Sequence, residues 1–310
     1  SLHSERRRDN QQWMLDWMVK TTGRTHNFAY DHREIPPEVK TYRQIPRVME
    51  KAGRHQETIA RAAEAAGHRQ SACELYYKAC ENYRIAQHAI FVDDHPDKIY
   101  LHGKLIESFT GCMRNADYPI ERVEIDWEGA RIQCNFHKVP GGRKLPTILS
   151  IPGMDQTKEA VPDPSNNLFI KRGMNVLAVD GPGQGMSNLR KIRVTADNHE
   201  RATSACVDWL TRQPEVDPAR IGVMGISMGS YWSNRLAAYD PRVKAIASSA
   251  ANYGTKKAIF EEASPRFKQI FMYMAGIHDE AEFDRMAEKM HLFGYGPKVK
   301  CYSLMVLGEY

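Results

Sequence analysis

The 310-residue sequence has no long apolar run and no large excess of charge of one sign. No stretch approaches the roughly 18 apolar residues of a membrane-spanning helix, and residues 1–6 lack the apolar core of a signal peptide. The net charge is only +5, and no aromatic residues are interleaved with the densest basic stretch, residues 6–8. We therefore expect a cytoplasmic protein with no nucleic-acid and no membrane partner.

Cysteine is scarce, and the six that occur never stand at C-x-x-C spacing. They are Cys73, Cys80, Cys112, Cys134, Cys206 and Cys301. In a chain of this size such scattered residues predict buried free thiols in a reducing compartment, and neither a disulfide framework nor a zinc site. The composition, 42% hydrophobic and 26% charged, is that of an ordinary globular protein. We expect no cofactor and no metal.

The first 118 residues are helical in pattern. Between positions 72 and 90, apolar or small residues recur at intervals of three and four, which places them on one face of an α-helix. An alanine-rich stretch at residues 59–66 comes before it and stops at Gly67, the residue type that commonly follows a helix C-terminus. The pair suggests a helical hairpin of the tetratricopeptide type, present in one copy, so we predict an N-terminal helical cap domain over residues 1–118 and no repeat array.

From residue 119 onward, short β-rich runs alternate with helical segments. The predicted strands cover residues 123–127, 130–137, 146–151, 175–179, 220–224, 243–247 and 300–307. Helices are expected at residues 165–171, 199–212 and 230–239, the first of them beginning at Asp163-Pro164. This alternation predicts an α/β fold with a mostly parallel sheet and helices on both faces. It lapses at residues 252–297, where we expect a lid-like insertion with a helical patch at residues 280–292.

Residues 225–229 read Gly-Ile-Ser-Met-Gly, a G-x-S-x-G nucleophile elbow centred on Ser227. In such an elbow a strand turns sharply into a helix, and the glycines keep side chains clear of the neighbouring strand and helix. The serine hydroxyl then stands exposed above a helix N-terminus, which favours negative charge. An ordinary Gly-rich turn is the alternative, but an apolar strand precedes this motif and an amphipathic helix follows it. Ser227 is therefore the candidate nucleophile.

An oxyanion hole needs two backbone N–H donors near that serine. One comes from the residue after the nucleophile, here Met228. The other is expected in the turn after the strand at residues 146–151, where Met154 is the candidate. A plain turn between strand and helix is the alternative reading of this segment, and Gly153 suits either.

A glycine run, Asp-Gly-Pro-Gly-Gln-Gly-Met-Ser, occupies residues 180–187 directly after the strand at residues 175–179. A glycine run in this position can mark a dinucleotide-binding loop. However, Pro182 removes one N–H group, and the G-x-G-x-x-G spacing is absent. The pattern therefore favours a tight loop that borders the active site.

At these residues the sequence resembles the α/β-hydrolase superfamily, and residues 216–229 are typical of its esterase and peptidase branch. Residues 152–159 and 180–187 look like the hydrolases with a helical N-terminal domain, the group of 2,6-dihydroxypseudooxynicotine hydrolase and the yellowish-green polyketide-shortening hydrolase. That resemblance implies hydrolysis of a carbon–carbon bond next to a ketone, a homodimer, and a substrate site roofed by the helical domain. Glu261 and Glu262 would then face the substrate, with an exposed lid helix as the alternative.

The sequence departs from the superfamily in its triad. The usual chain order is serine, acid, histidine, with the acid after the strand that we expect at residues 300–307. None of the twelve histidines follows His291, and Glu309 stands where the chain is still leaving that strand. His278 and His291 fall in the expected lid and are poor replacements for the base. We therefore expect the acid and the histidine beyond Tyr310, and little activity from the 310-residue form.

The sequence thus favours a serine hydrolase that acts by acyl transfer on a small-molecule carbonyl substrate. The resemblance points to a β-diketone or polyketide-like ketone. A carboxylesterase or a related peptidase is the alternative within the enzyme class, because the same elbow serves all of these reactions. A non-catalytic binding or regulatory protein on a hydrolase scaffold is the alternative from another class.

Overall fold

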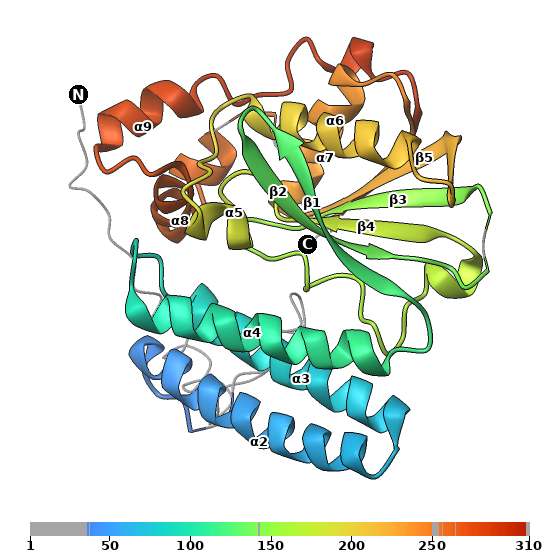
Figure 1. Cartoon of the computed structure of the whole chain (residues 1–310). Helices are drawn as coiled ribbons and strands as arrows, with labels where there is room; N and C mark the ends of the chain where they lie inside the picture. The colour runs from blue at the N-terminus through green and yellow to red at the C-terminus, as the bar shows by residue number, and fades with distance from the viewer. Residues whose placement is uncertain are drawn as a thin grey trace. The chain divides into compact units, whose positions relative to one another are not determined.

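The computed structural model describes residues 36, 38–141, 143–249, 254–255, 257–263 and 265–307. They form two compact units (Figure 1). The first unit contains the helices that precede Ala116 together with the segment Ala263–Gln269. The second contains Ala116–Glu262 and Ile270–Tyr310 and holds the β-sheet. Within the part of the chain that is described, every helix is too short or too polar to span a bilayer.

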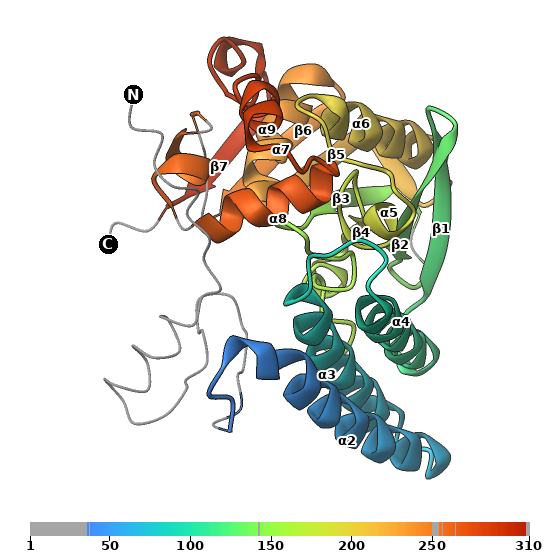
Figure 2. The ribbon, with the colours of Figure 1, turned by 90° about the vertical axis from the view of Figure 1, so that its left-hand side faces the viewer.

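The first unit is built from the helices α2 (Ile45–Ala65), α3 (Arg69–His88) and α4 (Pro96–Asn115), and the 3-10 helix η1 (Tyr42–Gln44) leads into α2. Helix α3 packs against both α2 and α4 (Figure 2). The expected hairpin is present, and Gly67, with φ +79°, follows the end of α2. Helix α2 begins earlier than the alanine-rich stretch indicates, because its buried face also includes Gly53 and Glu57, which are not apolar.

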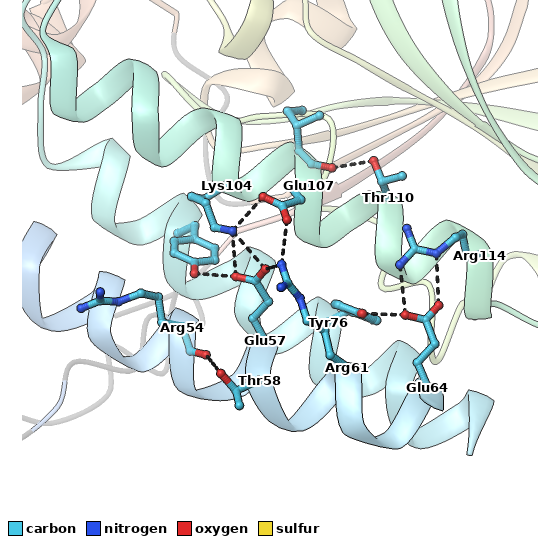
Figure 3. A network of polar contacts seen from close by, with 12 residues as sticks. Arg54, Glu57, Thr58, Arg61, Glu64, Tyr76, Lys104, Glu107, Thr110 and Arg114 are labelled. Carbon is cyan, nitrogen blue, oxygen red and sulfur yellow. Dashed lines mark hydrogen bonds and ion pairs between the residues drawn. The ribbon is translucent and has the colours of Figure 1, made fainter. Parts of the chain in front are cut away.

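A buried carboxylate joins these three helices, as Figure 3 shows. Glu57 accepts hydrogen bonds from the Tyr83 hydroxyl at 2.9 Å and the Lys104 ammonium at 3.0 Å, and it also pairs with Arg61. Burial tends to raise the pKa of Glu57, but the hydrogen bonds from Lys104 and Tyr83 outweigh this and lower it. The Tyr83 ring packs on Gly53, where an added Cβ would lie 2.9 Å from the ring. The three helices are therefore held by a polar network as well as by apolar contacts.

Glu64, nearer the end of α2, makes the first unit sensitive to acid. Hydrogen bonds from Arg114, Tyr76 and Asn115 reach its carboxylate and lower its pKa from 4.5 to about 2. A carboxyl group whose pKa is lower in the folded state than in the unfolded state stabilises the folded protein. This contribution is complete at pH values above the unfolded-state pKa. That stability is lost as the pH falls from 4.5 towards 2.

We expect Glu64→Gln to lower the free energy of unfolding by about 1 kcal/mol at neutral pH, after discounting for solvent screening. The difference between the two proteins should shrink as the pH falls through that window. Urea unfolding at several pH values measures it. A difference that stays constant with pH would contradict the role assigned to Glu64.

The second unit is organised by one seven-stranded sheet in the order β1-β2-β4-β3-β5-β6-β7. Its strands are β1 (Ile120–Trp127), β2 (Ala130–His137), β3 (Leu145–Ile151), β4 (Asn175–Val179), β5 (Val216–Ile226), β6 (Val243–Ser249) and β7 (Tyr302–Val306). β1 and β2 form a hairpin, and β2 is antiparallel to β4, whereas the other neighbouring strands are parallel. Figure 2 shows β1 and β7 at opposite edges. The mostly parallel sheet is confirmed, and β7 lies beside β6 at one edge.

The second unit also contains most of the remaining helical segments. They are η2 (Ile170–Arg172), α5 (Gly185–Leu189), α6 (Asn198–Thr211), α7 (Met228–Tyr239), the π-helix η3 (Lys257–Glu261), α8 (Pro265–Ala275), α9 (Glu280–Ala287) and η4 (Gly296–Lys298). Helix α8 starts within Ala263–Gln269 of the first unit. Helices α6 and α7 pack side by side, and α7 contacts β3, β5 and β6. The first residues of α7 therefore lie at the carboxyl ends of the central strands.

One expected helix is absent. Residues 163–169 form turns, and only η2 is helical there. The Asp163 carboxylate accepts hydrogen bonds from the N–H and hydroxyl of Ser165, and the Asn167 side chain accepts them from the N–H groups of Phe169 and Ile170. Short polar side chains that bind nearby N–H groups in this way compete with a helix. The Asp-Pro signal thus starts a turn, and the prediction for residues 165–171 is wrong.

The helical patch expected at residues 280–292 ends at Ala287, and His291 forms a β-bridge with Thr255. All six cysteines are free, as expected; five are buried and Cys301 is partly exposed.

Candidate active site

Ser227 lies between the last residue of β5 and the first residue of α7. Its backbone has φ 55° and ψ −125°, a conformation that residues other than glycine rarely adopt. Its N–H donates to the carbonyl of Ser249 at the end of β6, at 2.8 Å. Such strain persists only where the surrounding structure fixes the backbone. The sharp turn from strand to helix that the motif predicts is therefore present, with Ser227 at its apex.

The glycines on either side of Ser227 are required by crowding. A Cβ on Gly225 would lie 2.1 Å from the Gly229 carbonyl oxygen. A Cβ on Gly229 would lie 2.2 Å from the carbonyl oxygen of Ile151, the last residue of β3. In both cases the clash is with backbone, which cannot swing aside as a flexible side chain can. The G-x-S-x-G spacing follows from this packing of β3, β5 and α7.

The hydroxyl of Ser230, in the first turn of α7, forms hydrogen bonds with the ends of β5 and β6 next to the elbow. It accepts a hydrogen bond from the N–H of Ser249 at 3.0 Å. Its oxygen also lies 2.7 Å from the Ser249 carbonyl and 3.0 Å from the Gly225 carbonyl, so its proton is shared between these two acceptors. Strands β5 and β6 and helix α7 are therefore linked through one buried side chain.

The two candidate oxyanion donors lie in segments next to the nucleophile in space or in sequence. Met228 is the first residue of α7, and the first N–H groups of a helix have no acceptor within it. Met154 follows β3, and its side chain is buried. The neighbouring Gly153 lies against Ser227, since a Cβ placed on it would be 3.3 Å from the Ser227 Cβ. The structure thus brings both segments to the same edge of the sheet.

Behind this turn lies a fully buried ionic cluster. The Lys158 ammonium is 2.8 Å from the Glu159 carboxylate and 3.0 Å from that of Asp180, and none of the three side chains is exposed. Asp180 also accepts hydrogen bonds from the N–H groups of Lys158 and Met186, at 2.7 and 2.9 Å. Burial raises the pKa of Asp180, which the Lys158 ammonium opposes. The cluster joins the turn after β3 to the glycine run after β4.

The same cluster explains one glycine of the run. A Cβ on Gly185 would lie 2.5 Å from the Asp180 carboxylate, and the Met186 N–H already serves that carboxylate. Of the N–H groups of this loop, that of Met186 thus binds a carboxylate of the same chain. No cluster of three or more potential metal ligands is found among the described residues.

The two histidines considered as replacement bases both belong to the second unit. His278 is exposed, and the His291 carbonyl accepts a hydrogen bond from Arg235 at 3.2 Å. Among the described residues, no histidine is hydrogen-bonded to the Ser227 hydroxyl. Glu261 and Glu262 are exposed at the end of η3, and their contact with a substrate stays a prediction. Glu309 falls outside the described residues.

A mostly parallel sheet with an elbow between its fifth strand and the following helix defines an α/β-hydrolase. The chain belongs to the X-Pro dipeptidyl-peptidase (S15) family, a sequence model of which matches residues 128–293.

Curated relatives carry hydrolase names. The chain is 29% identical over 205 residues to 20-hydroxy-prefusarin hydrolase of Gibberella moniliformis, covering 62% of this chain and 48% of that protein. It is 32% identical over 185 residues to 2,6-dihydropseudooxynicotine hydrolase of Paenarthrobacter nicotinovorans, covering 59% of this chain and 48% of that protein. The chain thus spans about half the length of these relatives.

The fold has a solved counterpart. The crystal structure of 2,6-dihydroxy-pseudo-oxynicotine hydrolase superimposes with a TM-score of 0.74 at 24% identity, over 95% of this chain and 79% of that one. The resemblance that the motifs predict, to hydrolases with a helical N-terminal region, is confirmed.

Proposed function

We propose that the protein is a serine hydrolase in which Ser227 attacks a carbonyl carbon and forms an acyl-enzyme. The observation that carries this proposal is the strained backbone of Ser227, with φ 55° at the start of α7. Strain of this kind is concentrated at functional sites. The hydrolase names of the relatives support the same reaction class.

In the proposed reaction, a general base removes the proton of Ser227 as its oxygen bonds to the carbonyl carbon. The carbonyl oxygen becomes an oxyanion and accepts hydrogen bonds from the N–H groups of Met228 and Met154. The N-terminal end of α7 adds a favourable dipole. The leaving group then takes the proton from the base, and water releases the acyl group from Ser227 by the reverse sequence.

The base and the acid that orients it are proposed to lie outside the described residues. A serine hydroxyl is a weak nucleophile without a base within hydrogen-bond reach. The described residues include the proposed nucleophile and the two proposed donors. The activity proposed here therefore belongs to the full-length protein.

For the substrate we propose a β-diketone or a polyketide-like ketone, as the resemblance to the helical-domain hydrolases implies. Acyl transfer to Ser227 would then break a carbon–carbon bond, and the departing carbon, stabilised as an enolate, would take the proton. An ester or peptide substrate is the second candidate, and the match to a peptidase family model favours it. Both candidates use the same nucleophile and donors.

A hydrolysis screen of the full-length protein tests this proposal. The panel contains p-nitrophenyl esters, an X-Pro p-nitroanilide and aromatic 1,3-diketones, each also tested with Ser227→Ala. We expect turnover of the diketones to exceed that of the other two classes and to disappear in the variant. Faster ester or anilide turnover would replace the substrate proposal and keep the nucleophile. Turnover of no class, or turnover that survives in Ser227→Ala, would overturn the function.

A further inference from the structure

We propose that Gln184 is a positioning residue that aims the N–H of Met154 at the oxyanion. Gln184 lies in the glycine run, which the proposed chemistry otherwise leaves without a role. The inference rests on the proposed function, because it assigns to Gln184 a task in the oxyanion hole. It follows from the four hydrogen bonds of one buried amide.

The Gln184 side chain, which has no exposed surface, reaches across from the loop after β4 to the turn after β3. Its Nε2 donates to the carbonyl oxygens of Pro152 and Gly153, at 2.9 and 2.8 Å. These are the two carbonyls directly before the candidate donor Met154. Both amide protons of Gln184 are therefore used to hold that turn.

Because the peptide unit is planar, the hydrogen bond from Gln184 to the Gly153 carbonyl also sets the direction of the Met154 N–H. The peptide unit of Gly153 and Met154 is planar, and in the trans form its C=O and N–H point in opposite directions. Fixing the Gly153 carbonyl on Gln184 therefore fixes the Met154 N–H on the side facing away from Gln184. Gly153 itself lies against Ser227. A rotation of this one peptide would turn the donor away from the reacting carbonyl.

Gln184 is itself held in place by two donors. Its Oε1 accepts hydrogen bonds from the Gly181 N–H and from the Nε2 of His199, both at 3.1 Å. Burial lowers the pKa of His199 to about 3, so the ring is neutral at pH 7 and carries a single proton. That proton must be on Nε2, because an amide oxygen only accepts.

His199 links Gln184 back to the helix that carries the nucleophile. Its ring stacks on Trp232 of α7, with centroids 4.0 Å apart and planes at 3°. The turn that holds Met154 and the helix that begins at Met228 are thus connected through Gln184, His199 and Trp232. This connection keeps the two oxyanion donors in one geometry before a substrate arrives, which is the condition for electrostatic stabilisation of a transition state.

Only an amide meets these requirements at position 184. Methionine has nearly the same shape but donates nothing, and a glutamate carboxylate accepts only. Because the site is buried, water is not available to replace the lost donors at low cost. The Gly153 carbonyl also accepts a longer hydrogen bond from the Gln156 N–H, at 3.3 Å. Gln184→Met should therefore weaken the hold on this peptide, leaving it that longer bond, while the volume remains filled.

The experiment measures the reaction of an alkyl fluorophosphonate with Ser227 in the full-length protein. The P=O oxygen of the reagent takes the place of the carbonyl oxygen, and a concentration series separates the limiting rate from the half-saturating concentration. For Gln184→Met we expect the limiting rate to fall by about 10- to 100-fold, because one oxyanion donor is misdirected. The half-saturating concentration should stay unchanged, since that donor acts in the transition state.

The matched control is Asn175→Leu. Asn175 is also a fully buried amide, bonded to Glu215 and Thr147, but it lies at the opposite end of β4. This variant should lose comparable thermal stability and keep the limiting rate within about twofold. If Gln184→Met does not fold, Gln184→Glu provides the test, and the same fall is expected.

The outcomes separate the two proposals. If the wild type reacts at Ser227 and a folded Gln184 variant reacts at the same limiting rate, the role of Gln184 is wrong and the proposed function stands. A fall in Asn175→Leu equal to that in Gln184→Met would also overturn it, because stability alone would then account for both. A wild type that does not react at Ser227 would overturn the proposed function and this inference with it.

Discussion

Replacing Ser227 with alanine should lower the hydrolysis rate of the full-length protein by about 10³- to 10⁶-fold, because the acyl-enzyme can no longer form. The fold should be unaffected. The hydrogen bond from position 227 to Ser249 is made by the backbone, and alanine is no more strained at φ 55° than serine. Initial rates on the best substrate of the screen, together with thermal unfolding of both proteins, measure the two effects.

Ser204→Ala is the matched control for this loss. The Ser204 hydroxyl donates to the Asp240 carboxylate at 2.8 Å. Asp240 follows the last residue of α7 and lies about 20 Å along the helix from Ser227. Its removal should change the rate by no more than about twofold. A Ser227→Ala protein that retains more than a tenth of the wild-type rate would contradict a covalent mechanism at this serine.

Replacing Lys158 with methionine should have the largest effect on stability. It leaves the carboxylates of Glu159 and Asp180 buried with no exposed surface and without their cation. Breaking a buried ion pair by removing one partner costs about 3–5 kcal/mol. Urea unfolding, followed by tryptophan fluorescence, measures this loss.

Lys138→Met is the comparison for that experiment. Lys138 also pairs with two carboxylates, those of Glu121 and Glu215, but all three side chains reach solvent. The loss there should be about 1 kcal/mol or less. Equal losses of unfolding free energy in the two variants would show that the buried cluster stabilises the fold no more than the exposed one. The proposed role of the cluster in fixing the turn after β3 would then be wrong.

The central parallel strands could be predicted from the sequence because burial on both faces makes them largely apolar. The antiparallel strand β2 could be predicted because its apolar and polar residues alternate. The expected strand at residues 175–179 coincides with β4, and the expected strand at residues 130–137 with β2. Residues 45–58 of α2 were missed because a glycine and a glutamate occupy its buried face. Helix α4 was not singled out for a similar reason, since its buried face includes Lys98 and His102.

The elbow could also be predicted, because its glycine spacing reflects a local clash that any chain with this turn must avoid. The supporting residues could not. Lys158, Asp180 and Gln184 all stand within segments that the sequence singled out, but each has a partner in a different turn. Periodicity and spacing describe one segment at a time. Which buried carboxylate meets which lysine is decided only when β3 and β4 become neighbours in the sheet.

The central claim is that Ser227 is the activated nucleophile, and peptide mapping after fluorophosphonate labelling tests it most directly. Trypsin cleavage after Arg220 and Arg235 places Ser227, Ser230 and Ser233 in one peptide, residues 221–235. Fragment masses then distinguish the three serines. For the full-length protein we predict a single adduct on Ser227, absent from Ser227→Ala. An adduct on another serine, no adduct at all, or labelling that persists in Ser227→Ala would contradict the claim.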